Sequence, residues 1–133
     1  MILRATYVWS HPLTQKGKSH PQSPPVHLHF DQSETLFVAS GKVGTTLDYA
    51  GRDRVWTRED GTHEIKPWVP HTFWPHPEAG EDTVVYIVAH PDNVKEPMDW
   101  LFFINLLYLV SESSAGEAGL GPLQTITQIM VTQ

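Results

Sequence analysis

The chain has 133 residues, a length that accommodates one domain with a substantial core but not two. Nine Lys and Arg against fifteen Asp and Glu give a net charge of −6. This balance argues against binding to nucleic acids or anionic membranes, which attract proteins with a basic surface. The absence of cysteine excludes disulfides and thiolate metal sites and is typical of a reducing compartment, so we expect a cytoplasmic protein.

The first 25 residues are predicted to form an N-terminal strand followed by a loop. Residues 2–9 are rich in β-branched and aromatic side chains, which indicates an edge strand. Residues 10–25 hold four prolines and few apolar side chains, which favours a loop. This start lacks the basic and apolar regions of a secretory signal, which agrees with the expected location.

Residues 26–92 are predicted to form the core of the domain. Turn signals such as Gly41, Gly51 and Gly61 separate short runs of strand-forming residues. The candidate strands are 35–39, 42–49, 54–57, 63–66 and 83–89. Regular spacing of short strands predicts an antiparallel sandwich or barrel.

Residues 93–133 are predicted to form a helical C-terminal extension of the same domain. Pro97 and Asp99 suit the first turn of a helix, and residues 100–110 are apolar almost all round. About 20 apolar residues are needed to span a bilayer, so we expect no membrane span. The apolar helix must therefore pack on its own barrel or in the interface of a homodimer, which we expect this chain to form. From Pro122 onward a second, shorter amphipathic helix is predicted.

Two histidines near the start of the core are separated by one residue. Side chains of an extended strand alternate between its faces, so His27 and His29 point to the same side and can reach one point. Glu34 follows five residues later, a distance that allows a turn into a neighbouring strand, and His71 arrives from a proline-punctuated segment. Three imidazoles and one carboxylate suit a divalent transition metal: iron, manganese, nickel, copper or zinc.

These residues resemble the two motifs of the cupin superfamily. His27, His29, Glu34 and Gly41 match its first motif in identity and spacing, and residues 65–74 look like its second motif. The resemblance covers residues 24–91 and implies an all-β fold, a small antiparallel β-barrel or jelly roll. It also implies that His27, His29, Glu34 and His71 converge on a metal inside the barrel. The layout with a helical C-terminal extension is similar to that of small single-domain cupins of fungal secondary-metabolite pathways.

The second motif departs from the family pattern at two places. Such motifs have a glycine turn before the histidine, where this chain has Trp68 and Val69, so we expect the turn to be built differently. The polar residue that often follows the histidine is replaced by Trp74 or Pro75. Both changes concern the mouth of the expected pocket.

The same alternation predicts which side chains line that pocket. If Glu34 faces inward, so do Leu36 and Val38, and if His71 faces inward, so does Phe73. Stacking surface is expected from the other aromatic residues of the region, Trp56, Trp68, Trp74 and Tyr86. A mostly apolar pocket with a few polar groups is typical of a site for a small organic substrate.

Three functions fit this pattern. The first is a metal-dependent cupin enzyme of secondary metabolism, an oxygenase, isomerase, cyclase or decarboxylase. The second is a metal-free enzyme for cyclisation, dehydration or isomerisation, in which burial raises the pKa of Glu34 so that it acts as a general acid or base. The third is a non-catalytic domain that binds a small ligand.

Overall fold

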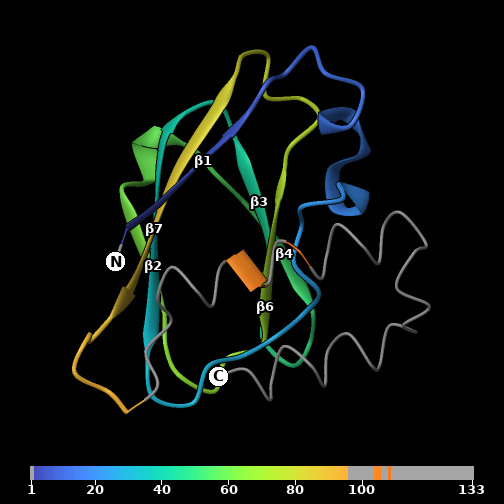
Figure 1. Ribbon diagram of the computed structural model, residues 1–133. Helices are drawn as coiled ribbons and strands as arrows, with labels where there is room; N and C mark the ends of the chain where they lie inside the picture. Colours follow the sequence, from blue (N-terminus) through green and yellow to red (C-terminus); the bar gives the residue numbers. More distant parts are fainter. Residues whose placement is uncertain (1, 96–103, 106–107, 109–133) are drawn as a thin grey trace.

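Two antiparallel sheets make up the computed structural model of the chain, which describes residues 2–95, 104–105 and 108 (Figure 1). The strands are β1 (Ile2–Tyr7), β2 (Ser33–Ser40), β3 (Val43–Leu47), β4 (Arg52–Trp56), β5 (Thr62–Ile65), β6 (His71–Pro75) and β7 (Thr83–His90). Two short 3₁₀ helices, η1 (Thr14–Ser19) and η2 (Arg58–Asp60), lie in the connections. The strands predicted at 2–9, 35–39, 42–49, 54–57, 63–66 and 83–89 are all present, with ends shifted by a few residues.

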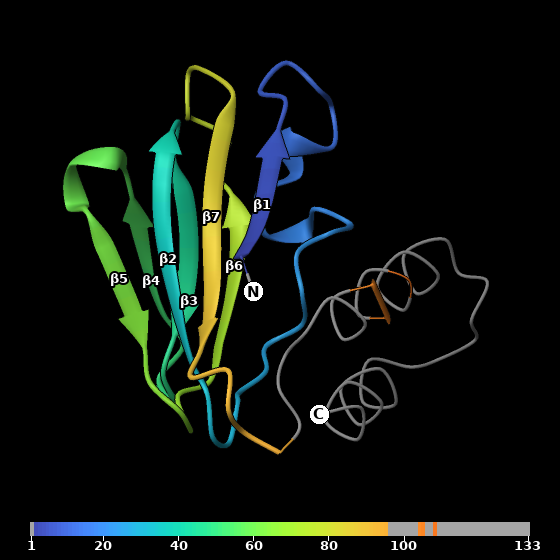
Figure 2. The ribbon, with the colours of Figure 1, turned by 60° about the vertical axis from the view of Figure 1, so that its left-hand side comes forward.

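The sheets have non-sequential strand orders, as in a jelly roll. The four-stranded sheet has the order β1-β7-β2-β5, and the three-stranded sheet has the order β4-β3-β6. Figure 2 shows the four-stranded sheet in front of the three-stranded one. This arrangement confirms the predicted antiparallel jelly roll and the edge position of β1.

The core lies between the two sheets because each sheet alternates apolar and polar side chains. Leu36 and Val38 of β2 and Val85 and Ile87 of β7 are buried on the inner face of the four-stranded sheet. From the other sheet, buried Val43, Trp56 and Phe73 join the same cluster. The core therefore uses the period of two that the sequence pattern predicts.

The proline-rich N-terminal loop contains an element that the sequence pattern does not indicate. η1 lies within residues predicted to be a plain loop and packs against β6. It covers part of the outer face of the three-stranded sheet, so this sheet is enclosed on both sides at β6.

Most of the predicted C-terminal extension lies outside the described residues. Of the apolar stretch 100–110, the structure describes Ile104, Asn105 and Tyr108, which are helical and have exposed side chains. In the part of the chain that the structure describes, no helix has the length and apolar character needed to cross a membrane. The second predicted helix and the boundary of the extension stay predictions.

Candidate metal centre

His27 and His29 lie on an extended segment that runs alongside the start of β6. His27 forms an isolated antiparallel bridge with His71, in which each backbone N–H donates to the other residue's carbonyl, at 2.9 and 2.7 Å. The segment is thus held like a strand at a single bridge, without the regular ladder that a full strand would have. This bridge places His27 directly beside His71.

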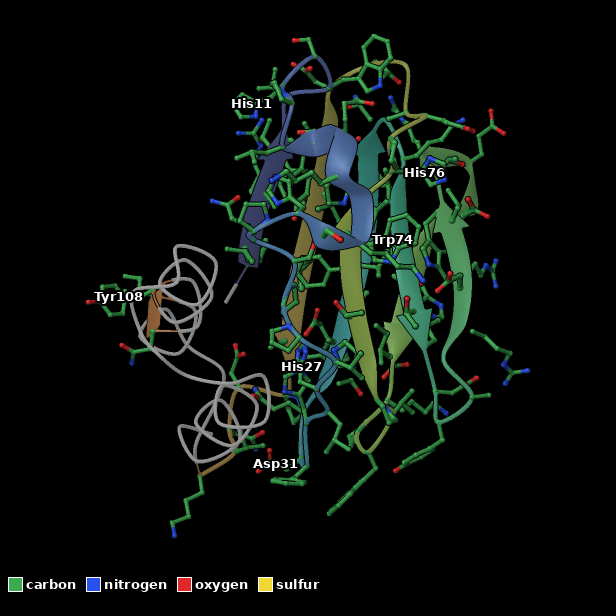
Figure 3. The ribbon with its side chains drawn as sticks, turned by 90° about the vertical axis from the view of Figure 1, so that its right-hand side faces the viewer. His11, His27, Asp31, Trp74, His76 and Tyr108 are labelled. Atoms are coloured by element: carbon green, nitrogen blue, oxygen red, sulfur yellow. The ribbon has the colours of Figure 1, made fainter. Side chains whose placement is uncertain are left out.

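The four ligand-type side chains come together between the sheets. Their nearest donor atoms, one from each of His27, His29, Glu34 and His71, all lie within 4.8 Å of one another, and all four side chains are buried. Glu34 Oε2 is 3.2 Å from His29 Nε2 and 3.5 Å from His71 Nε2. Figure 3 shows His27 toward the same end of the molecule as Asp31, with His11 and His76 toward the other end.

Backbone carbonyls fix two of the imidazole rings. His27 Nδ1–H donates to the carbonyl of Pro25 at 2.8 Å, and His71 Nδ1–H donates to the carbonyl of Val69 at 2.8 Å. A carbonyl can only accept, so both rings carry a proton on Nδ1, and in their neutral form they present the lone pair of Nε2. Histidines that bind metals are held in this way by a partner on the other ring nitrogen.

Burial and mutual repulsion keep His27 neutral. Burial lowers its pKa to about 3, and the neighbouring His71 and His29 add to the effect. For His71, burial alone would lower the pKa, but the adjacent Glu34 carboxylate outweighs burial and raises it. A neutral imidazole is the form that binds a metal.

Glu34 is ionised in this site, whereas a general acid would have to be protonated. Burial would raise the pKa of this carboxyl group, but the hydrogen bond with His29 and the proximity of His71 outweigh burial and hold the pKa well below its usual range. The prediction of a raised pKa is therefore wrong, because it considered burial without the surrounding imidazoles. Glu34 is a carboxylate in this site, a form suited to a ligand or a base.

The donor set fits a divalent cation. Glu34 Oε1 and His71 Nε2 are buried and have no hydrogen-bond partner among the described residues. Buried polar atoms without partners are costly and are rare in folded proteins. A cation held among His27, His29, Glu34 and His71 would satisfy both atoms, and three nitrogens with one carboxylate oxygen suit a transition metal.

Three of the predicted pocket residues lie on the inner faces beside this cluster. Leu36 and Val38 follow Glu34 on the same face of β2, and Phe73 follows His71 on the same face of β6. All three are buried core residues. Their predicted contact with a substrate stays a prediction.

Trp74 lies on the wrong face to line the pocket. It follows Phe73 directly in β6, so it projects from the outer face of the three-stranded sheet, where its ring covers Gly44. Lys18 of η1 lies 5.5 Å from the centre of the Trp74 ring, and His76 stacks on the ring at 5.7 Å. Figure 3 shows Trp74 beside η1. The tryptophan is buried because η1 covers it.

The prediction that Tyr86 lines the pocket is also wrong. It alternates with the core residues Val85 and Ile87 of β7 and is paired with Arg4 and Phe37, so it lies on the outer face of the four-stranded sheet. The two other expected stacking residues do not join the cluster either. Trp56 fills the core between Arg54 and His63, and Trp68 is exposed.

Sequence reasoning missed the groups that orient the histidines. The carbonyls of Pro25 and Val69 each belong to the residue two places before the histidine that they fix. Every residue has a carbonyl, so residue identity gives no signal for this role. The repeated spacing of two residues before each histidine becomes visible only with the backbone geometry.

No family model matches the chain. Among curated proteins, it is 32% identical over 106 residues to the probable oxidoreductase virH of Hypocrea virens, a match that covers 80% of this chain and 46% of that protein. It is 35% identical over 85 residues to the probable oxidoreductase patJ of Penicillium expansum, covering 64% of this chain and 26% of that protein. The chain therefore spans less than half the length of these relatives.

Solved structures with a similar arrangement include two proteins with little sequence identity to this chain. The Drosophila melanogaster CENP-C cupin domain superposes with a TM-score of 0.47 at 10% identity, over 68% of this chain and 60% of that one. Fe(II) HppE superposes with a TM-score of 0.45 at 16% identity, over 67% of this chain and 42% of that one.

Proposed function

We propose that this chain, which has the cupin fold, is a metal-dependent enzyme that carries out an oxidoreductase reaction on a small organic molecule. The observation that carries the proposal is the buried convergence of His27, His29, Glu34 and His71, in which two buried polar atoms lack hydrogen-bond partners among the residues that the structure describes. The fungal relatives, whose names describe them as oxidoreductases, favour redox chemistry over isomerisation, cyclisation or decarboxylation. We place the reaction in secondary metabolism and the protein in the cytoplasm, as the sequence suggests.

The side chains of the cluster have distinct roles in this proposal. His27 and His71 offer Nε2 because Pro25 and Val69 hold their Nδ1 protons. Glu34 supplies the one negative charge that offsets part of the charge of the cation. When bound, iron, manganese or copper would supply redox chemistry, whereas nickel or zinc would supply Lewis acidity.

The apolar side chains next to the cluster define the kind of substrate. Leu36, Val38 and Phe73 form an apolar wall beside Glu34 and His71. Such a wall excludes water and favours a substrate with an apolar body and an oxygen or similar group that can approach the cluster.

Elemental analysis of the purified chain tests the proposal. We expect one transition metal per chain in the wild type and in the His11→Ala variant, because His11 lies at the far end of the molecule. We expect His27→Ala to lose the metal. Equal metal content in wild type and His27→Ala, or no metal after loading with each of the five candidates, would contradict the metal site.

A metal-free enzyme is the second candidate, and one observation favours it. Glu34 and His29 form a buried hydrogen-bonded pair, which could accept and return a proton without a metal. Because Glu34 is a carboxylate, this mechanism would use it as a base. Full turnover in the presence of a strong chelator would establish this candidate, and tight ligand binding without turnover would point to a binding domain.

We further propose that the chain forms a homodimer through the outer face of its four-stranded sheet. The centre of this face is apolar and consists of Phe37, Val84, Tyr86 and Val88, with exposed Ile2 at its edge. Arg4 lies on β1 at one side and Glu64 on β5 at the other, both exposed. In the register of the sheet Arg4 is level with Thr62, two positions from Glu64, so a two-fold axis inclined to the strands would bring Arg4 toward Glu64 of the partner subunit. This face is then complementary to itself.

A further inference from the structure

Trp68 adopts a backbone conformation that tryptophan rarely takes. It lies between β5 and β6 with a φ of 67°, in the left-handed region. Glycine is the usual residue there, because a Cβ atom makes the conformation unfavourable. Its side chain is 58% exposed, so burial of the indole ring does not account for a tryptophan at this position.

The turn around Trp68 contacts two of the four residues in the cluster. The backbone N–H of Trp68 donates to the carbonyl of His29 at 2.8 Å. The carbonyl of the next residue, Val69, accepts the Nδ1–H of His71 at 2.8 Å. The direction of the Val69 carbonyl relative to the Trp68 N–H depends on the backbone angles at Trp68, so its left-handed conformation contributes to the relation between His29 and His71.

Two side chains hold Trp68 in this conformation. Its ring packs on that of Phe30, with centroids 4.8 Å apart and planes inclined by 48°. Tyr49 donates its hydroxyl hydrogen to the carbonyl of Trp68 at 3.0 Å. Phe30 directly follows His29, so the ring contact ties the turn to the histidine segment a second time. Strained residues persist where surrounding contacts determine their conformation, and they are found at functional sites.

We propose that Trp68 is a positioning residue that sets the geometry of the metal site through its backbone. The proposal rests on the metal site proposed above and assigns to Trp68 no contact with the metal or the substrate. Its ring supplies the contact with Phe30 that keeps the strained turn in place. The turn then orients His71 through Val69 and fixes the segment that carries His29.

Alanine and glycine at position 68 separate the two roles of the residue. Trp68→Ala keeps the unfavourable Cβ atom but loses the ring contact, so the turn should relax and the histidines should shift. Trp68→Gly also loses the ring, but glycine adopts a φ of 67° without strain. Trp9→Ala is the control, because Trp9 is a partly exposed tryptophan whose indole N–H bonds to Pro77.

The measurement is titration of each metal-free full-length variant with Co²⁺ alone, followed by the visible absorption of the bound ion. We expect Trp68→Ala to bind Co²⁺ about tenfold more weakly with an altered spectrum, as for loss of a group that orients a ligand. Trp68→Gly should bind within about threefold of the wild type, and Trp9→Ala should bind as the wild type does. Circular dichroism and thermal unfolding of the metal-free variants check that each is folded.

Several results would overturn the proposal. Wild-type affinity and spectrum in Trp68→Ala would show that the turn does not position the ligands. An equal loss in Trp68→Gly would show that the ring acts other than through the backbone, and an equal loss in Trp9→Ala would indicate general destabilisation. In all three cases the wild-type protein would still bind Co²⁺, so the proposed metal site would stand. If the wild type binds neither Co²⁺ nor any of the five candidate metals, both proposals are wrong.

Discussion

Tyr7 shows how burial of one ionisable group makes stability depend on pH. It is a core residue at the end of β1, and burial raises its pKa to about 12 from 10.0. Above pH 10 the unfolded chain loses the Tyr7 proton while the folded chain retains it, so the unfolded state binds fewer protons. The contribution of Tyr7 is therefore complete below pH 10 and is lost as the pH rises toward 12.

We expect the free energy of unfolding of the wild type to fall by about 2 to 3 kcal/mol between pH 10 and pH 12 from this residue. Tyr7→Phe keeps the ring and removes the ionisable hydroxyl group. The fall in its free energy of unfolding over the same pH range should therefore be smaller by that amount. Urea unfolding at a series of alkaline pH values measures both. Identical slopes for the two proteins would show that Tyr7 is not a source of alkaline instability.

The site residues illustrate what the sequence could and could not predict at this scale. The spacing of His27, His29 and Glu34, together with the resemblance to the cupin motifs, predicted that these side chains meet, and the structure brings them together. The pKa of Glu34 was not predictable, because its direction depends on how closely His29 and His71 approach it. The carbonyl that accepts the Nδ1–H of each histidine was not predictable either, because this contact depends on the backbone geometry.

At the scale of elements, Gly44 and Trp74 explain how β3 and β6 fit together. Gly44 lies opposite Trp74 in the register of the two strands, and the indole ring covers its Cα. A Cβ atom at position 44 would overlap three atoms of the ring. Trp74 is confined by η1 on its other side, so the ring has little room to move.

We expect Gly44→Ala to lower the free energy of unfolding by about 3 kcal/mol, the upper end of the usual cost of overpacking. A smaller ring should relieve the overlap, so Gly44→Ala combined with Trp74→Phe should be less unstable than the sum of the single changes. Chemical denaturation of the four proteins forms a double-mutant cycle. Additive effects would mean that the two residues do not interact as described.

The errors in the predicted pocket also belong to this scale. Strand alternation correctly placed Leu36, Val38 and Phe73 on the inner faces, and the same rule places Trp74 and Tyr86 on the outer faces. They were expected in the pocket because aromatic side chains offer stacking surface to a substrate. The residue pattern did not indicate η1, which buries Trp74 on the outside of the sheet.

At the scale of the whole molecule, the proposed dimer makes a prediction about charge. Arg4 and Glu64 form no ion pair in the described part of the chain, and both are exposed on the same sheet face. In the proposed dimer each Arg4 would approach Glu64 of the partner subunit. Reversal of either charge should then create repulsion, and reversal of both should restore attraction.

We expect sedimentation velocity at micromolar concentration to show a dimer for the wild type. Arg4→Glu and Glu64→Arg should each weaken association by about tenfold, and the double variant should recover most of it. The predicted apolar helix offers a different interface, for which neither charge would matter. A dimer that is insensitive to all three variants would exclude the sheet face, and a wild-type monomer would exclude the dimer.

The central claim is that a cation is held among His27, His29, Glu34 and His71, and anomalous diffraction tests it most directly. Crystals of the protein loaded with each candidate metal would be measured on both sides of that metal's absorption edge. For at least one metal, the account predicts a single strong anomalous peak within bonding distance of the three Nε2 atoms and of Glu34. Absence of a peak there for all five metals, or a peak bound by other side chains, would contradict the claim.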